Sequence, residues 1–240
     1  MKKILDRLSR YNNFKGGIIP FFFHHNYFVN KWIAKWVKTF SHLLSGKVLD
    51  FGCGSKPYKN TISHIEYIGV DIKISGHDHK NEYIDVFYDG KTLPFEDAYF
   101  DSIFSTEVFE HVSNLPEILT ELSRVIRPGW VLLCTMPFIW PEHEQPFDFQ
   151  RYTSFDIIHN IENVWFTCIT HMKTTTAVET IFQLWNNYLG MVLFTENRLW
   201  NIFCQLVCIM PSTLIWSILS LILPKKSSIY HTNVVVFKKK

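Results

Sequence analysis

The sequence predicts an α/β fold, doubly wound, with a mostly parallel sheet of seven strands. Three observations support this prediction. Short apolar runs recur from Lys47 to the end of the chain, they lack the polar–apolar alternation of half-exposed strands, and segments with helical or loop patterns separate them. Strands of this kind are typical of a parallel sheet whose two faces are covered by helices.

Residues 1–45 are predicted to form an N-terminal helical lead-in. In FVNKWIAKWVKTFSHLL, Trp32, Trp36 and Phe40 recur at helical spacing with lysines between them, which indicates an amphipathic helix lying on the sheet. Charged residues interrupt the first residues, MKKILDRLSRYNN, so we do not expect a signal peptide there.

Residues 46–174 and 233–240 are predicted to form the core of the fold. Its first five strands are expected in KVLDF, EYIGVDI, NEYIDVFY, FDSIFSTE and WVLLCTMPF. Before the fifth run, VFEHVSNLPEILTELSRVI has apolar residues at helical spacing, and Pro128 and Gly129 are expected to stop that helix. NVWFTCITHM and NVVVFKKK are expected to be the last two strands.

Residues 175–232 separate those last two strands and are predicted to form a hydrophobic helical insert. Within it, residues 199–224 contain no charged side chain, and basic residues flank them on both sides. A run of this length is enough for a helix to cross a bilayer. A single crossing would leave the last strand on the wrong side of the membrane, so the chain must return. Pro211 is expected to break the run into two helices of about 11 to 12 residues each.

The insert has three alternative roles. It can contact a membrane as a shallow hairpin or an interfacial patch, with nearby lysines meeting anionic lipid head groups. It can instead form a cap that is buried on the protein itself, or a contact between the subunits of a homodimer.

Composition narrows the class of protein. Apolar residues make up 47% of the chain, and the formal net charge is +2, so we expect no nucleic-acid partner. The five cysteines are odd in number and show no CxxC spacing, which favours reduced thiols in a cytoplasmic protein over a disulfide framework. A membrane role for residues 199–224 would place the protein at the inner face of the membrane.

A Gly-x-Gly turn, Gly52-Cys53-Gly54, follows the first predicted strand and is typical of a nucleotide site. Relative to G-x-G-x-x-G, Pro57 takes the place of the third glycine. Asp50 stands two residues before the turn, and Asp71 ends the next strand, near the distance expected of a carboxylate that binds ribose hydroxyls.

The acid at position 50 decides between two classes of ligand. A carboxylate beside the turn disfavours a negatively charged pyrophosphate and favours a ligand with a positive amino group and a sulfonium. The pattern therefore favours S-adenosylmethionine over NAD. Glycines at the turn let the backbone approach such a cofactor without a Cβ in between.

Four motifs, in order, resemble those of class I S-adenosylmethionine-dependent methyltransferases, in particular the small bacterial type related to ubiquinone-biosynthesis methyltransferases. They are VLDFGCGSKPY, YIGVDI, YDGKTLPFEDAYFDSIFSTEVFEHV and LSRVIRPGWVLLCTMPF, and they cover Lys47 to Phe138. Trp130 departs from the family, which often has a second glycine there. PEHEQPFDFQRYT resembles a segment of members found among polysaccharide and cell-envelope biosynthesis genes. The resemblance implies a Rossmann-like fold and methyl transfer from S-adenosylmethionine to a small-molecule or glycan acceptor.

The same resemblance implies roles for individual residues around the cofactor. The methionine end would be wrapped by Asp50, Gly52, Cys53 and Gly54, and the floor near the sulfonium would be lined by Ser105, Thr106 and Glu107. Asp71 would accept hydrogen bonds from both ribose hydroxyls, and Ile72 would pack near the adenine.

Two acids are candidates for the residue that would reach the adenine amino group. It is Asp89 in the preferred alignment, with Asp85 as the alternative. Either aspartate can instead serve only to stabilise a turn, without contacting a cofactor. Cys53 is better explained as a small side chain that packs in the core than as a nucleophile. The run His77-Asp78-His79 is interpreted as a solvated loop, so no metal site is predicted.

Two histidines are candidate general bases. A base is needed only when the acceptor loses a proton as it attacks, as a sugar hydroxyl does. His111 lies in VFEHV after the fourth strand, and His143 lies in PEHEQP after the fifth, where its polar neighbours suit acceptor binding: Glu142, Glu144, Asp148 and Arg151. Either histidine can instead have a structural role, in which its imidazole forms a hydrogen bond to a loop.

Two other functions are considered for the protein: an NAD-dependent oxidoreductase and a non-catalytic S-adenosylmethionine-binding module.

Overall fold

The computed structural model describes residues 26–76, 79 and 82–240. These residues form two compact units. The larger contains residues 37–172 and 233–240, and the smaller contains residues 26–36 and 173–232. The predicted lead-in before residue 26, and His77 and Asp78 of the HDH run, lie outside the described residues.

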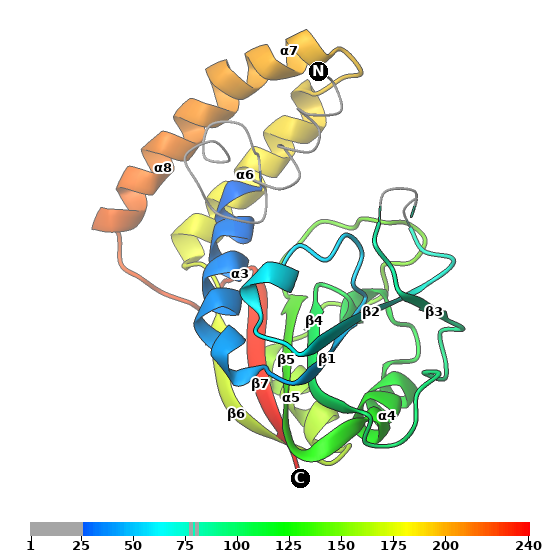
Figure 1. The fold of residues 1–240 in the computed structure, drawn as a ribbon. Coiled ribbons are helices and arrows are strands. Elements are labelled where there is room, and N and C mark those ends of the chain that lie inside the picture. Colours follow the sequence, from blue (N-terminus) through cyan, green and yellow to red (C-terminus); the bar gives the residue numbers. More distant parts are fainter. Residues whose placement is uncertain (1–25, 77–78, 80–81) are drawn as a thin grey trace. The chain divides into compact units, whose positions relative to one another are not determined.

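A seven-stranded sheet lies at the centre of the larger unit, in the order β3-β2-β1-β4-β5-β7-β6 (Figure 1). Its strands are β1 (Lys47–Phe51), β2 (Glu66–Ile72), β3 (Val86–Tyr88), β4 (Phe100–Thr106), β5 (Ile126–Pro137), β6 (Phe166–Lys173) and β7 (Thr232–Lys239). Strands β1 to β5 pair in parallel. With one antiparallel hairpin the sheet is mostly parallel, and the predicted fold class is confirmed.

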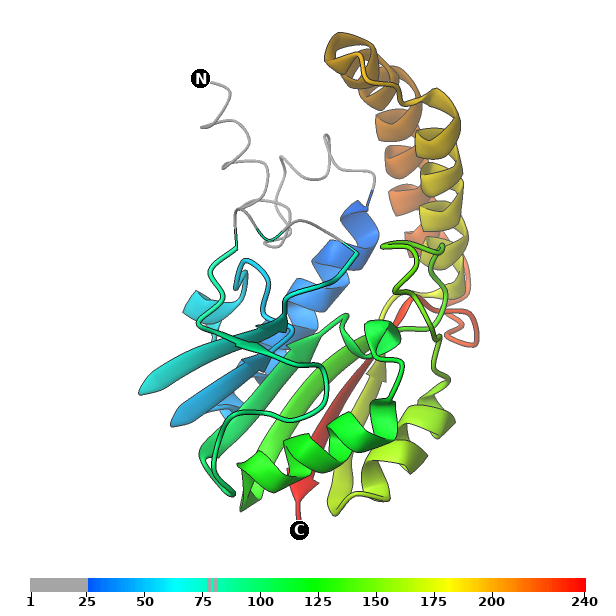
Figure 2. The same ribbon diagram turned by 90° about the vertical axis from the view of Figure 1, so that its right-hand side faces the viewer.

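Helices α4 (Leu115–Val125) and α5 (Ser154–Glu162) pack into one apolar core with the sheet (Figure 2). The apolar residues of α4 recur at helical spacing, so one face of the helix is buried while the other is polar. Fully burying each large apolar side chain contributes roughly 1.5–3 kcal/mol. The core joins α4, α5, β1 and β5 through Ile118, Leu122, Ile157, Ile161, Leu49, Leu132 and others.

The remaining helical elements before β6 are α3 (Tyr27–Phe40), η1 (Ser41–Leu43), η2 (Lys59–Thr61) and η4 (Phe109–His111).

The end of α4 differs from the prediction. The helix ends at Val125, and Pro128 and Gly129 lie inside β5 instead of terminating the helix. A residue before proline is disfavoured in the α conformation, so the chain turns extended ahead of Pro128. Gly129 has a φ of +84°, and the pairing of β4 with β5 shifts register between Phe100 and Ser102.

The sheet has a topological switch point between β1 and β4. From β1 the chain proceeds through β2 to β3 on one side, and from β4 it proceeds to β5 on the other. Because these strands are parallel, their carboxyl ends meet at one edge, where ligands bind in open α/β sheets. The predicted cofactor residues therefore gather at this edge.

The smaller unit contains a helical hairpin. Helix α6 (Ala177–Leu193) begins with a capping box, in which Thr176 and Glu179 exchange hydrogen bonds. The chain then turns and continues through α7 (Arg198–Cys204), the π-helical turn η5 (Gln205–Ile209) and α8 (Met210–Ile222) (Figure 1).

The expected break at Pro211 is wrong. Arg198–Ile222 is a continuous helix of 25 residues, and α6 supplies the second arm of the hairpin. Pro211 sits in the first turn of α8, directly after η5. A proline lacks an N–H and clashes with the carbonyl of the preceding turn, and the wider π-helical turn ahead of Pro211 accommodates both effects.

The hairpin differs from a typical water-soluble pair of helices in that polar side chains are buried and apolar side chains are exposed. Many of its buried side chains are polar: Asn186 Nδ2 donates to Thr213 Oγ1 at 3.0 Å, and Ser212 Oγ donates to Asn186 Oδ1 at 2.8 Å. Its exposed side chains are largely apolar, including Trp185, Met191, Leu199, Phe203, Leu214, Ile215, Ile218, Leu221 and Ile222. Only 22% of the most apolar window of the long helix is buried within the protein.

Candidate active site

The turn after β1 is built from two glycines in left-handed conformations. The φ angles are +70° at Gly52 and +44° at Gly54. The amides of Gly52 and Cys53 both donate to the carbonyl of Val70, at 2.9 and 3.1 Å, so the turn is fixed to the end of β2. A Cβ at position 52 would overlap the side chain of Val108. Both backbone conformation and space therefore require glycine at position 52.

We expect Gly52→Ala to destabilise the protein strongly. The left-handed conformation costs roughly 1–2 kcal/mol for a residue with a Cβ, and the clash with Val108 adds roughly 1–3 kcal/mol of overpacking. Gly90→Ala is the matched control, because Gly90 has a φ of +81° but no atom lies within 4 Å of the position that a Cβ would take. Thermal unfolding of both variants measures the difference. Equal losses of stability would contradict the proposed contact with Val108.

Asp50, near the end of β1, and Cys53, within the turn, both have buried side chains. Asp50 is only 3% exposed, and the Tyr67 hydroxyl donates to its Oδ2 at 2.8 Å. Burial raises the pKa of Asp50 to about 7, although the hydrogen bond from Tyr67 opposes this change. Cys53 is buried against Gly69, and burial raises the pKa of its thiol, so it is placed as filler rather than as a nucleophile.

Asp71 links the end of β2 to the glycine turn. Its Oδ2 accepts from the Gly54 amide at 3.0 Å, and its Oδ1 accepts from the Ile72 amide at 2.8 Å. Burial raises the pKa of Asp71, while these two amides lower it. The carboxylate and Ile72 thus lie beside the turn, as required of residues that contact the ribose and the adenine.

Asp89 and Asp85 occupy different positions along β3. Asp89 follows β3 at the carboxyl edge, where its Oδ1 accepts from the amides of Lys91 and Thr92 at 2.9 and 2.8 Å. Asp85 precedes β3, accepts from the Gly69 amide at 2.7 Å and forms an ion pair with Lys56. Asp89 is therefore the acid on the ligand side of the sheet, although its carboxylate also stabilises a turn.

The residues after β4 lie next to those of β5. Ser105 is buried, and within the described residues its Oγ has no hydrogen-bond partner. Thr106 is paired with Thr135 across the two strands. Glu107 has a φ of +53°, and its Oε1 accepts from the Thr135 hydroxyl at 2.7 Å. Ser105 and Thr106 end β4, and Glu107 follows them at the carboxyl edge of the sheet.

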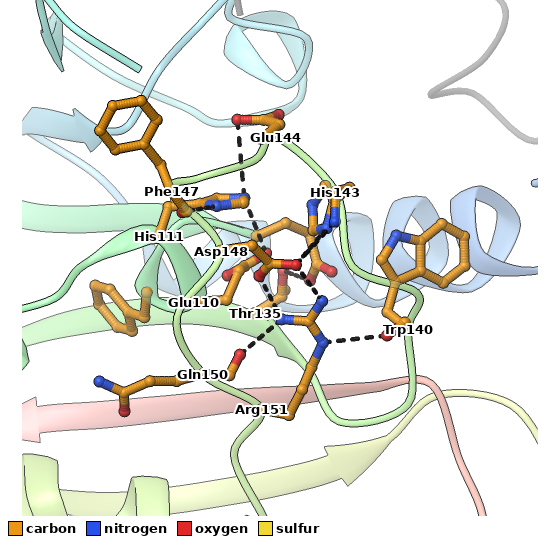
Figure 3. A network of polar contacts seen from close by, with 12 residues as sticks. Glu110, His111, Thr135, Trp140, His143, Glu144, Phe147, Asp148, Gln150 and Arg151 are labelled. Carbon is orange, nitrogen blue, oxygen red and sulfur yellow. Dashed lines mark hydrogen bonds and ion pairs between the residues drawn. The ribbon is translucent and has the colours of Figure 1, made fainter. Parts of the chain in front are cut away.

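Glu110 and His111 begin a polar network that follows β4 (Figure 3). Glu110 is fully buried, and neither of its carboxylate oxygens has a hydrogen-bond partner within the described residues. Burial and the nearby charge of Glu107 raise its pKa well above the usual value. His111 Nδ1 lies 2.7 Å from the carbonyl of Phe147, while its Nε2 lies 3.8 Å from Glu110 Oε1 and 3.9 Å from Glu144 Oε2.

His143 joins the same network from the segment after β5. Its ring centroid lies 4.8 Å from that of His111, and its Nδ1 lies 3.2 Å from Asp148 Oδ2. Arg151 binds Asp148 through two nitrogens, at 2.5 and 2.6 Å (Figure 3). Burial and the adjacent His111 lower the pKa of His143. Asp148 is partly desolvated, which opposes ionisation, but Arg151 and the His143 amide lower its pKa to about 2.

The sequence patterns locate most of this network but miss its buried member. His111 and His143, which are far apart in the chain, are brought together, Asp148 lies beside His143, and Arg151 binds Asp148. Glu142 is exposed and lies at the margin of this network. Glu110 is the member that the patterns miss. An acid directly before His111 is the available signal, but its burial depends on packing that is distant in sequence.

A family model described as a methyltransferase domain matches residues 49–134, within the span of the four motifs. A 2-phytyl-1,4-naphtoquinone methyltransferase of Synechocystis is 27% identical over 56% of this chain and 62% of its own length. A phthiotriol/phenolphthiotriol dimycocerosates methyltransferase of Mycobacterium ulcerans is 34% identical over 41% of each chain. A ubiquinone biosynthesis O-methyltransferase of Paraburkholderia phymatum is 28% identical over 42% of this chain and 49% of its own length. The chain thus spans between two fifths and two thirds of these relatives.

Solved structures share the fold at low sequence identity. Phosphoethanolamine N-methyltransferase 2 of Haemonchus contortus, solved with S-adenosyl-L-methionine, aligns with a TM-score of 0.54 and 18% identity over 92% of this chain and 55% of that one. A sarcosine dimethylglycine methyltransferase described as putative, from Galdieria sulphuraria, aligns with a TM-score of 0.52 and 14% identity over 88% and 84% of the two chains.

Proposed function

We infer that this chain, which belongs to the class I S-adenosylmethionine-dependent methyltransferases, transfers a methyl group to a hydroxyl of a small-molecule or glycan acceptor. One observation carries the choice of a hydroxyl. Glu110, His111 and His143 cluster beyond the ends of β4 and β5, at the sheet edge that holds the glycine turn. A hydroxyl must lose its proton as it attacks, and groups that act on this proton are needed for acceptors of this kind.

The residues around the turn fit S-adenosylmethionine. Gly52 and Gly54 present backbone without a Cβ, and the Asp71 carboxylate lies beside them for the ribose hydroxyls. The buried Ser105 hydroxyl has an unused hydrogen-bonding capacity within the described residues. When bound, the cofactor supplies a methyl group on a sulfonium, which departs as a neutral thioether.

The chain's own contribution to the reaction is alignment of the acceptor and control of its proton. Alignment of two reactants at near-attack distance contributes up to roughly 7–11 kcal/mol. His143 has a lowered pKa and is therefore neutral near pH 7, the form that accepts a proton. The carboxylate of Asp148, held by Arg151, lies 3.2 Å from Nδ1 of this imidazole. The two imidazoles are thus the groups that act on the acceptor hydroxyl, and they contribute roughly 10²–10⁴-fold.

The acceptor that fits best is lipid-linked, in cell-envelope polysaccharide synthesis at the cytoplasmic face of a membrane. Two features support this choice. The exposed apolar surface of residues 199–224 suits a peripheral contact with a bilayer. The relatives from Synechocystis and Paraburkholderia are named for a phytyl naphthoquinone and for ubiquinone, both with long hydrocarbon tails. A membrane-bound enzyme would meet such an acceptor in the plane where it resides.

Calorimetry and product analysis test the function. We expect the purified protein to bind S-adenosylmethionine and not NAD, and to form S-adenosylhomocysteine when a hydroxyl acceptor is supplied. We expect His143→Ala to bind the cofactor as the wild type does but to lose turnover by roughly 10²–10⁴-fold. Binding of NAD alone would contradict the family assignment. Weakened cofactor binding by His143→Ala with an unchanged chemical step would contradict the role of His143.

A further inference from the structure

Both arms of the helical hairpin are uncharged between their ends. Residues 180–195 of the first arm and residues 199–224 of the second contain no charged side chain. One end is the turn of residues 194–198 between α6 and α7, which holds one acid and one arginine (Figure 1). The other end is the base, residues 173–177 and 223–226, where the chain enters α6 and leaves α8. Each arm is therefore a length of uncharged helix between two charged ends.

The exposed faces of both arms are apolar. Every exposed side chain of residues 181–192 and 199–222 is aliphatic, aromatic or methionine. A helix that lies in the plane of a membrane surface keeps a charged or polar face toward water, and neither arm has such a face. Little of the most apolar window of the long helix is buried within the protein, so this helix is not the core helix of a soluble fold. The exposed faces therefore favour hydrocarbon around both arms.

The two arms have the lengths of membrane-crossing helices. Helix α6 has 17 residues and the long helix has 25. At 1.5 Å per residue they are about 26 and about 38 Å long, and the hydrocarbon core of a bilayer is about 30 Å thick. The longer arm fits by tilting, and slight thinning of the bilayer accommodates the shorter one. Two crossings return the chain to its starting side, which β7 requires because it lies in the sheet between β5 and β6.

The polar contacts between the arms are those of helices that meet inside a membrane. Asn186 of α6 forms hydrogen bonds with both Ser212 and Thr213 of α8, and all three side chains are buried. Gln183 Nε2 donates to Asn187 Oδ1 at 2.8 Å within α6. Hydrocarbon offers no partner to a polar side chain, so such groups lie between helices, where they bind one another. The hairpin thus keeps its polar groups away from its apolar exterior.

Basic and aromatic side chains gather at the base. The amide of Ala177 donates to the carbonyl of Lys226 at 2.7 Å, which joins the start of α6 to the segment after α8. Trp32 Nε1 of α3 donates to Glu179 Oε1 at 3.1 Å, which fixes α3 to the same end of the hairpin. The ammonium of Lys35 lies 4.3 Å from the centre of the Trp32 ring. Tryptophan and lysine in this arrangement are typical of the boundary between a bilayer and the cytoplasm.

We propose that α6 and the helix Arg198–Ile222 cross a membrane as a two-helix hairpin, with the base at the cytoplasmic face and the turn at the opposite face. The base carries Lys173, Lys225 and Lys226, against one arginine at the turn, and an excess of basic residues marks the cytoplasmic side. This crossing rests on the membrane contact of the proposed function and goes deeper than a peripheral contact. It anchors β6 and β7 at the face where the lipid-linked acceptor is expected.

Labelling of introduced cysteines in spheroplasts of a bacterial host tests the crossing. With a membrane-impermeant maleimide, we expect Glu196→Cys in the turn to be labelled from outside. Lys226→Cys at the base is the matched control and should be labelled only after detergent opens the membrane. Both positions are exposed, so the difference reports the side of the membrane. The wild-type chain, with its own five cysteines, gives the background. Alkaline carbonate, which releases proteins bound only at the surface, should leave the wild type in the membrane pellet.

Protection of both introduced cysteines until detergent is added would overturn the crossing, as would release of the wild type by carbonate. A peripheral contact would then describe the hairpin. Labelling of Lys226→Cys from outside would overturn the orientation. A chain found only in the soluble fraction would remove the crossing together with the membrane contact. Failure of the proposed methyl transfer is separate, because it appears as an absence of S-adenosylmethionine binding by a protein whose hairpin still crosses the membrane.

Discussion

Asp71→Ala is expected to lower the affinity for S-adenosylmethionine by at least about 100-fold. Asp71 ends β2 beside Gly54, and in the proposed site its carboxylate would accept hydrogen bonds from both ribose hydroxyls of the cofactor. Hydrogen bonds to a charged group contribute roughly 1.5–3 kcal/mol each, and each 1.4 kcal/mol changes a dissociation constant tenfold. Two such bonds therefore account for a loss of this size. Calorimetric titration of the purified variant measures it.

Three further variants separate recognition of the ribose from disruption of the turn. Asp71 also accepts the amides of Gly54 and Ile72, so Asp71→Asn, which keeps an acceptor oxygen, should retain more of the turn than Asp71→Ala. Asp89→Ala should cost less than about tenfold, because its exposed carboxylate also serves a turn. Asp156→Ala in α5 is the control for a surface acid. An affinity of Asp71→Ala equal to that of Asp156→Ala would remove Asp71 from the binding site.

The backbone positions proposed to hold the cofactor could be placed from sequence because they depend on local chemistry. The apolar runs before Gly52 and around Asp71 specify buried parallel strands, and parallel strands place their carboxyl ends together. The glycines mark backbone that a side chain would not permit, as the contact between a Cβ at position 52 and Val108 shows. Patterns within a few residues were enough to locate these positions.

The polar network proposed to act on the acceptor was less predictable because it depends on contacts between distant segments. Glu110 is buried beneath the segment after β5, whose Phe149 and Gln150 amides donate to its carbonyl. No local pattern distinguishes such an acid from an exposed one. The same limit explains the error at Pro211, since a π-helical turn is decided by the packing around it. Polar residues at helical spacing within apolar α6, at Gln183, Asn186 and Asn187, were a usable signal for its role as the second arm.

The second large expected effect is on membrane binding by the hairpin. The double variant Ile215→Glu/Ile218→Glu should weaken binding of the protein to vesicles of phosphatidylcholine and phosphatidylglycerol by at least about 100-fold. The two side chains are 54% and 51% exposed on the long apolar helix. An apolar exterior is unfavourable in water and favourable against lipid, and buried polar side chains such as Asn186 and Thr213 hydrogen-bond across the helices, as they do between helices in membranes. A charged residue in a bilayer costs roughly 2.5–3.5 kcal/mol, and cosedimentation measures the loss.

A matched control and a second measurement distinguish lipid from protein as the partner of this surface. Ile65 is 92% exposed but lies outside the hairpin, so Ile65→Glu should bind vesicles as the wild type does. If the surface instead joins two subunits, sedimentation without lipid will show a homodimer that Ile215→Glu/Ile218→Glu converts to a monomer. A wild-type protein that remains monomeric and does not bind vesicles would contradict the membrane contact. The acceptor would then have to reach the glycine turn from solution, and a soluble sugar would replace the lipid-linked one as the expected substrate.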